Sequence, residues 1–473
     1  MTRLAEGSVL DGFAVGPRVH SGAMADLYRV HYDGGRADPG FPMVMKVPRT
    51  GGGEGAENLV GYEVEQQMLQ ELDGPHVPRF VAAGDLARQP FLVMEYVEGR
   101  TLQALLDDAV ASGQRPCVDD IVRIGRALAL AVHALHRQHA VHLDLKPANV
   151  ILRPDGRCVL LDFGLSWHAH YPDLLAEQMR PAIGSPAWMA PEQVVGVRGD
   201  PRSDLFAIGA ILYEFATGEL PFGAPQTQGG LRQRLWMAPA PPRALRADLP
   251  TWLQEVILHC LEPLAAHRPV SAAHLAFDLG HPEQVKVGPR GLRTKRTPFA
   301  VQFRRWLRAA GMHYQPSPPP AERLDEAPIV MVAIPHRDAS DAALHALRQA
   351  VQRSLGIRPG ARLACVTVVD PPGAQEDETA LHRLHAERLR QWARGLQLDG
   401  HQASFHVLQS GDVAGALLAY AGANHASLVV LGAATHGLAL QRIIPTVPAR
   451  VAAEAPCSVL LVKEAPPLAL LAT

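Results

Sequence analysis

Apolar positions recur in two different ways along this chain of 473 residues. Up to about residue 280, short strand-like runs come first and long helical patterns follow them. From Pro328 onward, short apolar strands alternate regularly with helices. The first pattern is typical of a mixed α+β domain and the second of an α/β domain, so we predict two domains.

The second pattern predicts individual elements. Strands are expected at residues 329–334, 362–369, 404–408, 427–431 and 457–462, and helices at residues 339–355, 376–396, 412–423 and 447–453. Parallel strands need crossover connections, and each predicted helix supplies one. We therefore expect a doubly wound, mainly parallel, Rossmann-like sheet over residues 328–465.

The residues between the two domains have a different composition. Lys286 to Ala321 contains no acidic residue, is rich in arginine and ends in a proline-rich run. These features predict a linker over residues 281–327. Basic residues in the linker are mixed with aromatic ones, including Phe303 and Trp306. Packing of these rings on the first domain is the simpler interpretation, and a helix that binds an anionic surface is the alternative.

Charge and cysteine content restrict the class of protein further. Lys plus Arg number 45 and Asp plus Glu number 47, which argues against a molecule-wide attraction to nucleic acid or membrane. The five cysteines are scattered and never in C-x-x-C spacing, so neither a disulfide framework nor a zinc site is indicated. No apolar run approaches about 18 residues, and the first residues lack the apolar segment of a signal peptide. We expect a cytoplasmic protein with no transmembrane segment and no nucleic-acid partner.

Candidate chemistry lies in two neighbouring segments. Residues 140–149 read A-V-H-L-D-L-K-P-A-N, and a D-F-G turn follows at residues 162–164. An Asp followed five residues later by Asn, and then by D-F-G, is typical of one phosphoryl-transfer site. These motifs, in this order, make residues 8–280 resemble a bacterial serine/threonine protein kinase of the eukaryotic type, which has a bilobal α+β fold.

The resemblance implies a role for each residue of the two motifs. Asp144 would be the catalytic base that accepts the proton of the substrate hydroxyl. Lys146 would neutralise the γ-phosphate, and a lysine at this position indicates serine and threonine as the acceptors. Asn149 and Asp162 would bind Mg²⁺.

The resemblance also implies a site for ATP. Lys46 would hold the α and β phosphates, with Glu65 as its ion-pair partner and Glu63 as the alternative. We favour Glu65 because Leu69 and Leu72 follow it at the spacing of one buried helix face. Gly22 would approach the phosphates, and Leu27, Val44 and Ile151 would enclose the adenine. Met94 would be the gatekeeper residue, and the backbone of Glu95 and Val97 would form the hinge that meets the adenine edge.

Two regions depart from the kinase pattern. Gly22 is the only one of three expected loop glycines, because His20 and Ala25 occupy the other two positions. Side chains there stiffen the approach of backbone amides to phosphate, so we expect weakened ATP binding. Leu143 stands where the family usually has an arginine that holds an activation-segment phosphate. We therefore expect activity that does not require phosphorylation of this segment.

Other matches to the kinase pattern are structural. Residues 184–192 resemble the segment that docks a polypeptide substrate, with Ser185 at the position that contacts the catalytic Asp. Asp204 begins a helix of the D-x-x-x-x-G type. Arg268 is expected to be the buried partner of Glu192, and loss of either would leave an unpaired buried charge.

Residues 328–465 resemble a universal stress protein, most clearly at residues 428–432 and 455–462. ATP-binding members of that family carry an Asp at the end of the first strand and a glycine-rich motif after the fourth. Pro335 stands in place of the Asp, and only Gly432 and Thr446 match the second motif. The mismatched positions are Thr435 and Pro445. We expect no ATP binding in this domain, although the crevice at the switch point of the sheet could hold another ligand.

The leading hypothesis is an enzyme that uses ATP and Mg²⁺ to phosphorylate serine and threonine in protein substrates. Its C-terminal domain would sense a condition, recruit substrates or form a homodimer through the strand at residues 459–462, and an ordinary edge strand is the alternative. The main rival function is a pseudokinase scaffold that signals by binding, since both nucleotide signatures are eroded. Phosphorylation of a small molecule is a third hypothesis, which the docking segment at residues 184–192 disfavours.

Overall fold

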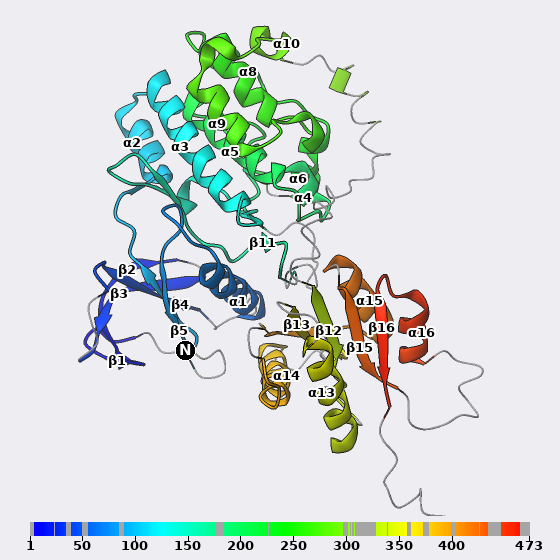
Figure 1. Cartoon of the computed structure of the whole chain (residues 1–473). Helices are drawn as coiled ribbons and strands as arrows, with labels where there is room; N and C mark the ends of the chain where they lie inside the picture. Colours follow the sequence, from blue (N-terminus) through cyan, green and yellow to red (C-terminus); the bar gives the residue numbers. More distant parts are fainter. Residues whose placement is uncertain are drawn as a thin grey trace, which may run out of the picture. The chain divides into compact units, whose positions relative to one another are not determined.

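A computed structural model gives the fold (Figure 1). It describes residues 4–22, 24–34, 39–49, 55–84, 89–171, 173, 175, 184–225, 227–296, 301–302, 304, 307, 328–337, 339–356, 361–371, 378–398, 401, 403–424, 426–433 and 446–463. The chain forms two compact units. The first comprises Met1–His168 and Met179–Ser317, and the second comprises Ala169–Gln178 and Pro318–Thr473.

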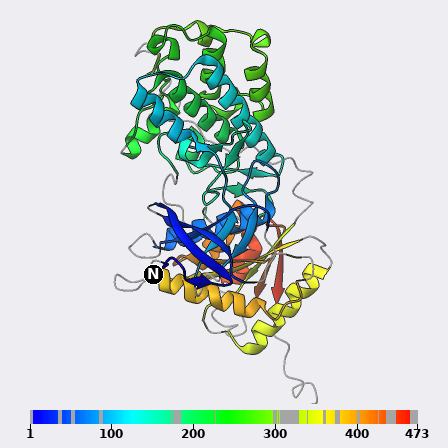
Figure 2. The same cartoon turned by 90° about the vertical axis from the view of Figure 1, so that its left-hand side faces the viewer.

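The first unit has two lobes (Figure 2). Its N-terminal lobe is a six-stranded antiparallel sheet in the order β1-β2-β3-β4-β6-β5, beside one helix, α1. Apolar residues on one side of the sheet form the lobe's core, including Phe13, Met45, Phe91 and Val93. The elements of this lobe are β1 (Val9–Leu10), β2 (Phe13–Ser21), β3 (Ala25–Tyr32), β4 (Met43–Pro48), α1 (Gly55–Glu71), β5 (Phe80–Ala83) and β6 (Leu92–Glu95).

The second lobe of the first unit is mainly helical. α3 shows why: its apolar residues recur every three or four positions, and they are buried against α5 and α9. The main helices are α2 (Leu102–Ser112), α3 (Val118–His136), α4 (Pro191–Val194), α5 (Arg202–Thr217), α6 (Gln228–Arg232), α7 (Pro242–Leu245), α8 (Thr251–Cys260), α9 (Ala272–Gly280) and α10 (Pro289–Leu292). This lobe also contains short strands, which are β7 (Arg100–Thr101), β8 (Ala140–Val141), β9 (Val150–Leu152), β10 (Cys158–Leu160) and β11 (Trp167–His168).

A glycine allows the central helix α5 to approach α8. A Cβ atom added to Gly209 would lie 2.5 Å from the Cβ of Cys260. Any side chain at this position would therefore push the two helices apart. The D-x-x-x-x-G pattern that begins at Asp204 thus marks a packing requirement at its last position.

The first part of the basic segment packs on the helical lobe. Gln254 of α8 donates hydrogen bonds from its side-chain amide to the backbone carbonyls of Arg290, Gly291 and Arg293, at 2.8, 3.0 and 2.8 Å. Arg290 also pairs with Glu255 at 2.8 Å. Phe303 and Trp306, the rings for which we expected packing, lie outside the described residues.

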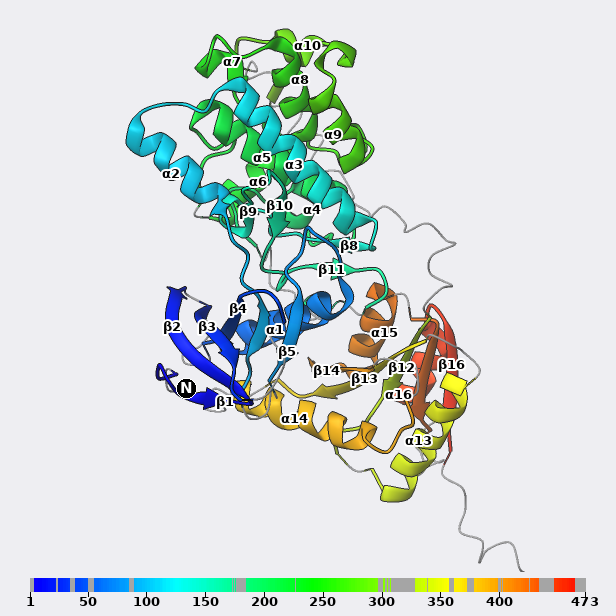
Figure 3. The same ribbon diagram turned by 60° about the vertical axis from the view of Figure 1, so that its left-hand side comes forward.

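The second unit contains a five-stranded sheet in the order β14-β13-β12-β15-β16, and every pairing is parallel. α13 and α14 pack on one face, and α15 and α16 pack on the other (Figure 3). The predicted doubly wound sheet is confirmed, with each element close to its expected position. The elements are β12 (Ile329–Ala333), α13 (Asp341–Gly356), β13 (Arg362–Val369), α14 (Glu378–Ala393), β14 (Ala403–Gln409), α15 (Val413–Ala423), β15 (Leu428–Gly432), α16 (Val447–Glu454) and β16 (Ser458–Val462).

The second unit also contains a short segment from the middle of the chain, Ala169–Gln178. Tyr171 lies against Arg362, whose guanidinium carbon is 3.8 Å from the centre of the ring. The backbone N–H of Asp173 donates to the side-chain oxygen of Asn424. Part of the segment that follows D-F-G therefore folds with the second unit.

Candidate active site

The buried carboxylate of Asp204 holds the loop between β8 and β9 in place. Asp204, at the start of α5, accepts hydrogen bonds from the backbone N–H groups of His142 and Leu143, each at 2.9 Å. The Nε2 atom of His136 lies 2.8 Å from the same carboxylate. Burial opposes ionisation of Asp204, but the hydrogen bonds from His136 and from the His142 backbone outweigh it and lower its pKa. A charged Asp204 thus fixes the loop that carries Asp144.

The carboxylate of Asp144 has three neighbours. Its Oδ1 accepts the backbone N–H of Ser185 at 2.8 Å, and its Oδ2 lies 3.0 Å from the Nζ of Lys146. The side-chain amide of Asn149 donates to Oδ2 at 3.2 Å and to the Asp144 carbonyl at 3.0 Å. The Nζ of Lys146 also donates to the hydroxyl of Ser185, at 3.0 Å. The expected contact between Ser185 and Asp144 is confirmed, and the carboxylate is fixed in position from several sides.

A backbone hydrogen bond places Asn149 beside the turn that carries Asp162. Because the amide nitrogen of Asn149 donates to Asp144, the side-chain oxygen of Asn149 points the other way. The backbone N–H of Leu161 donates to the Asn149 carbonyl at 2.8 Å, which brings the D-F-G turn beside it. Asp162 has a positive φ of 63°, an uncommon backbone conformation. One amide oxygen and one carboxylate form a donor set that suits a hard cation such as Mg²⁺.

Lys46 connects both lobes of the first unit. Its Nζ lies 2.6 Å from Glu65 in α1 and 2.9 Å from Asp162. The expected pair with Glu65 is therefore present. Burial alone would lower the pKa of Lys46, but the charges of Asp162 and Glu65 outweigh it and raise this pKa. The charge of Lys46 in turn lowers the pKa of Asp162, so both groups stay ionised near neutral pH.

The residues expected to surround an adenine lie on strands of both lobes. Val44 of β4 is buried and pairs with Met94 of β6, while Leu27 of β3 pairs with Lys46. Ile151 lies on β9 of the helical lobe. The carboxylate of Glu95 points away to Arg79 and Arg153, at 3.2 and 2.5 Å. Glu95, like Val97 two residues later, can thus serve a ligand only through its backbone.

The phosphate loop makes a tight turn at its one surviving glycine. The backbone N–H of Gly22 donates to the carbonyl of Ala25 at 3.0 Å. A Cβ atom on Gly22 would lie 3.4 Å from the Nε2 of His20, so the imidazole already fills part of the space. Arg49 ties the two sides of the loop together through Ser21 at 2.6 Å and Asp26 at 2.8 Å.

The predicted buried ion pair between Arg268 and Glu192, at the end of residues 184–192, is confirmed. The Nη1 of Arg268 lies 2.6 Å from Oε1 of Glu192, and Nη2 lies 2.7 Å from Oε2. The side chain of Arg268 is 0% exposed and that of Glu192 is 4% exposed. Ser203 donates to the same carboxylate at 2.6 Å. This bidentate pair anchors the end of residues 184–192 to the helical lobe.

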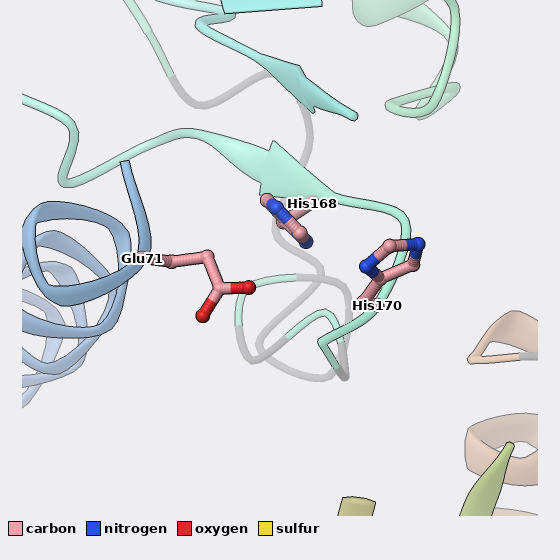
Figure 4. Close-up of side chains that lie close together, drawn as sticks. All are labelled: Glu71, His168 and His170. Carbon is pink, nitrogen blue, oxygen red and sulfur yellow. The ribbon is translucent and has the colours of Figure 1, made fainter. Parts of the chain in front are cut away.

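Sequence patterns gave little sign of several contacts. The pairs Arg153–Glu95 and His136–Asp204 join residues that are far apart along the chain. Figure 4 shows Glu71, at the end of α1, and His168, in β11, whose potential ligand atoms lie within 4.8 Å of each other. No sequence pattern links these two residues.

In the second domain, the described positions of the expected nucleotide signature come from three elements. Pro335 follows β12 and is exposed, Gly432 ends β15, and Thr446 precedes α16. Thr435 and Pro445 lie outside the described residues.

The bilobal fold, with Lys46 paired to carboxylates of both lobes, is the arrangement that the kinase pattern of the sequence predicted. The model of the protein kinase domain matches residues 37–277, about half of the chain, and the model of the universal stress protein family matches residues 329–463. The chain belongs to the protein kinase family and carries a universal stress protein domain after the kinase domain.

Curated relatives match the kinase part. The chain is 32% identical over 282 residues to serine/threonine-protein kinase pkn2 of Myxococcus xanthus, which covers 57% of this chain and 32% of that protein. It is 28% identical over 278 residues to serine/threonine-protein kinase PknL of Mycobacterium tuberculosis, which covers 58% of this chain and 66% of that protein. The chain thus spans less than two thirds of either relative. Within the described ranges, no helix combines the length and apolar character that a membrane crossing needs.

Proposed function

We propose that this chain is a serine/threonine protein kinase that transfers the γ-phosphate of ATP to protein hydroxyl groups. One observation carries the proposal: Lys46 and Asp162 form one polar network that joins the two lobes, and Asp144, Lys146 and Asn149 form a second one on the loop after β8. A phosphoryl-transfer site needs a base, oxygen ligands for a cation and fixed positive charge, and these networks provide all three. The names of the curated relatives support the same activity.

In the proposed mechanism, Asp144 orients the substrate hydroxyl and accepts its proton. The hydroxyl oxygen forms a bond to the γ-phosphorus while the bond from this phosphorus to the ADP oxygen breaks. Ser185 and Asn149 hold the carboxylate of Asp144 by hydrogen bonds at 2.8 and 3.2 Å. Lys146, 3.0 Å from this carboxylate, is placed to stabilise negative charge on the transferred group.

The nucleotide would be held by the N-terminal lobe. Lys46 would bind the α and β phosphates, and Gly22 would approach them with its backbone. Leu27, Val44 and Ile151 would enclose the base, and the backbone of Glu95 and Val97 would meet its polar edge. Mg²⁺, bound by Asn149 and Asp162, would neutralise phosphate charge.

The scaffold alternative rests on the eroded nucleotide signatures. A protein that signals by binding alone needs neither a base nor two metal ligands. The structure keeps Asp144 fixed by hydrogen bonds and keeps Lys46 paired with Glu65 at 2.6 Å. The eroded phosphate loop then predicts weaker affinity for ATP rather than loss of transfer.

For the C-terminal domain we propose a role in sensing, recruitment or dimerisation. β16 lies at the edge of the sheet, and its residues Leu460 and Leu461 are 37% and 41% exposed. An edge strand with exposed leucines can pair with the same strand of a second copy. The proposal includes a cytoplasmic site of action, supported by five cysteines that are all free thiols.

The deciding experiment is transfer of labelled γ-phosphate from Mg-ATP to the chain itself and to a generic serine/threonine substrate. We expect Asp144→Asn to lower the rate by roughly 10²–10⁴-fold, because the variant keeps the side-chain shape and loses the base. The matched control is Asp155→Asn, which changes an exposed carboxylate in the β9–β10 turn and should leave the rate unchanged. A folded wild-type protein that transfers no phosphate at ample Mg²⁺ would favour the scaffold.

A further inference from the structure

A cavity of about 540 Å³ opens within the second unit, beside α13 and α14. It is lined by the loop after β12, the first half of α13, the middle of α14 and one residue of β13. Pro335, the first position of the damaged nucleotide signature, is one of the lining residues, but no residue of β15 is, so the cavity lies on the side of α13 and α14 rather than at the β12/β15 switch point. The cavity therefore needs its own explanation.

The lining is strongly basic. Five of its residues are arginine or histidine, and Asp341 is its one carboxylate. Arg337 is partly neutralised by Asp370 at 3.2 Å, whereas Arg388 forms no ion pair among the described residues. The basic residues of the lining are His336, Arg337, Arg348, His385 and Arg388.

Two polar atoms in the lining lack partners within the described parts of the chain. They are the hydroxyl oxygen of Thr367, whose residue is 3% exposed, and the Nε2 of His336. Buried polar atoms of this kind are normally satisfied by protein, water or ligand. Thr367 stands on β13 at the floor of the cavity, so a ligand or water that enters it is the available partner.

The histidines of the cavity already experience its positive charge. The rings of His336 and His385 meet edge to face, with their centres 5.8 Å apart. Burial lowers the pKa of His385, and the neighbouring Arg388, His336 and Arg337 lower it further. A negatively charged group placed between these side chains would relieve this repulsion.

We propose that the cavity between α13 and α14 binds a small anion that carries phosphate or carboxylate groups. Arg348 and Arg388 approach it from the two helices, and the imidazoles and the Thr367 hydroxyl offer hydrogen bonds. Leu344, Leu389 and Trp392 give it an apolar side, so the ligand can include an organic part as well. The occupant is a small molecule, because the cavity is too small for a folded partner.

The test is titration calorimetry of the full chain with two probes, inorganic pyrophosphate and citrate, which separate a phosphate ligand from a carboxylate ligand. No Mg²⁺ or nucleotide is added, because both probes bind Mg²⁺ and a nucleotide could itself enter the cavity; the variant Lys46→Ala, titrated in parallel, reports any binding in the kinase unit. We expect at least one probe to bind, and we expect Arg388→Gln to weaken it at least tenfold. Arg388 is exposed and should be replaceable without loss of folding.

Matched controls lie on the same helices but outside the cavity. Arg348→Gln should weaken binding, whereas Arg353→Gln, one to two turns further along α13, should change it less than twofold. Arg394→Gln, just after α14, should likewise have no effect. Thr367→Val provides a second test inside the cavity, since it removes the hydroxyl and keeps the shape. Equal affinity in all variants, or no binding of either probe to the wild type, overturns the proposal.

Discussion

Buried carboxylates position most of the functional side chains in the first unit. Asp204 fixes the catalytic loop, Glu65 fixes Lys46 and Glu192 fixes the docking segment. Each is buried and each has a charged or hydrogen-bonding partner, which is the condition for keeping a charge inside a protein. The site therefore depends on residues that would never touch a substrate.

Arg268→Ala should destabilise the kinase unit by about 3–5 kcal/mol, because it leaves the charge of Glu192 buried without its partner. The free energy of unfolding, from urea denaturation followed by circular dichroism, measures this. Arg157→Ala is the control: its pair with Asp155 is exposed, so its loss should leave the free energy of unfolding close to the wild-type value. Similar losses for both variants would contradict the assigned role of the buried pair.

A buried histidine should make the second unit sensitive to acid. Burial, with a smaller effect of His382, lowers the pKa of His406 from 6.5 to about 3. Between these values the unfolded chain binds a proton that the folded chain does not, so stability falls as pH drops below 6.5. The expected slope is about 1.4 kcal/mol per pH unit from this residue. Above pH 6.5 it contributes no pH dependence.

Urea denaturation between pH 7.5 and 5 measures this slope, and His406→Gln should reduce it because glutamine binds no proton. The exposed His345 of α13 supplies the control variant, His345→Gln, which should keep the wild-type slope. An unchanged slope in His406→Gln would show that other groups cause the acid sensitivity.

At the level of residues, the sequence predicted which candidate site residues would lie together better than it predicted the residues that hold them in place. Asp144, Lys146 and Asn149 lie within six residues, and their order alone indicates their use. Glu65 was found from the spacing of Leu69 and Leu72, both buried in the structure. The pairs Arg153–Glu95 and His136–Asp204 could not be predicted, because each depends on how distant elements pack.

Among the elements, the segment after D-F-G bears on the prediction that kinase activity does not require phosphorylation. The hydroxyl of Ser166 is buried and donates to the His142 carbonyl at 3.2 Å. Tyr171 is 9% exposed and lies against Arg362. Neither hydroxyl is presented to solvent in a way that suits an incoming phosphate.

We expect a variant with both Ser166→Ala and Tyr171→Phe to keep kinase activity within about threefold of wild type, because Leu143 cannot hold a phosphate on this segment. The rate of labelled phosphate transfer measures this. Phosphatase treatment of the wild-type protein should likewise leave the rate unchanged. Loss of transfer in a folded double variant would show that one of these hydroxyls is required.

Elements were easiest to predict in the second unit. Its strands are short, apolar and separated by amphipathic helices, so the period of the pattern identifies each one. In the basic segment, composition alone predicted a linker and did not reveal the helix at its start. Residues 289–292 form a helix that docks on α8 through Gln254 and Glu255, and a docked helix and a free linker can share one composition.

For the whole molecule, two compact units predict two unfolding transitions in calorimetry. Mg²⁺ with a non-hydrolysable ATP analogue at about 100 times its Kd should raise the transition of the kinase unit by roughly 5–10 °C. The transition of the second unit should not move, since Pro335 occupies the position of the expected Asp.

The variant Lys46→Ala should abolish this shift, because it removes the side chain proposed to hold the phosphates. A shift of both transitions in the wild type would show that the second unit also binds nucleotide. A shift of neither, in a protein that unfolds cooperatively, would contradict the proposed ATP site.

The burial of Leu143 also determines how long a stimulus can act on this protein. A kinase with an arginine at this position can store an activating event as a covalent phosphate, which lasts until a phosphatase removes it. Leu143 is 4% exposed and offers no charge to retain such a group. We therefore expect the loop that carries Asp144 to keep no covalent record of earlier stimuli. Output should follow the present concentrations of nucleotide, ligand and substrate, and it should decline as soon as they do.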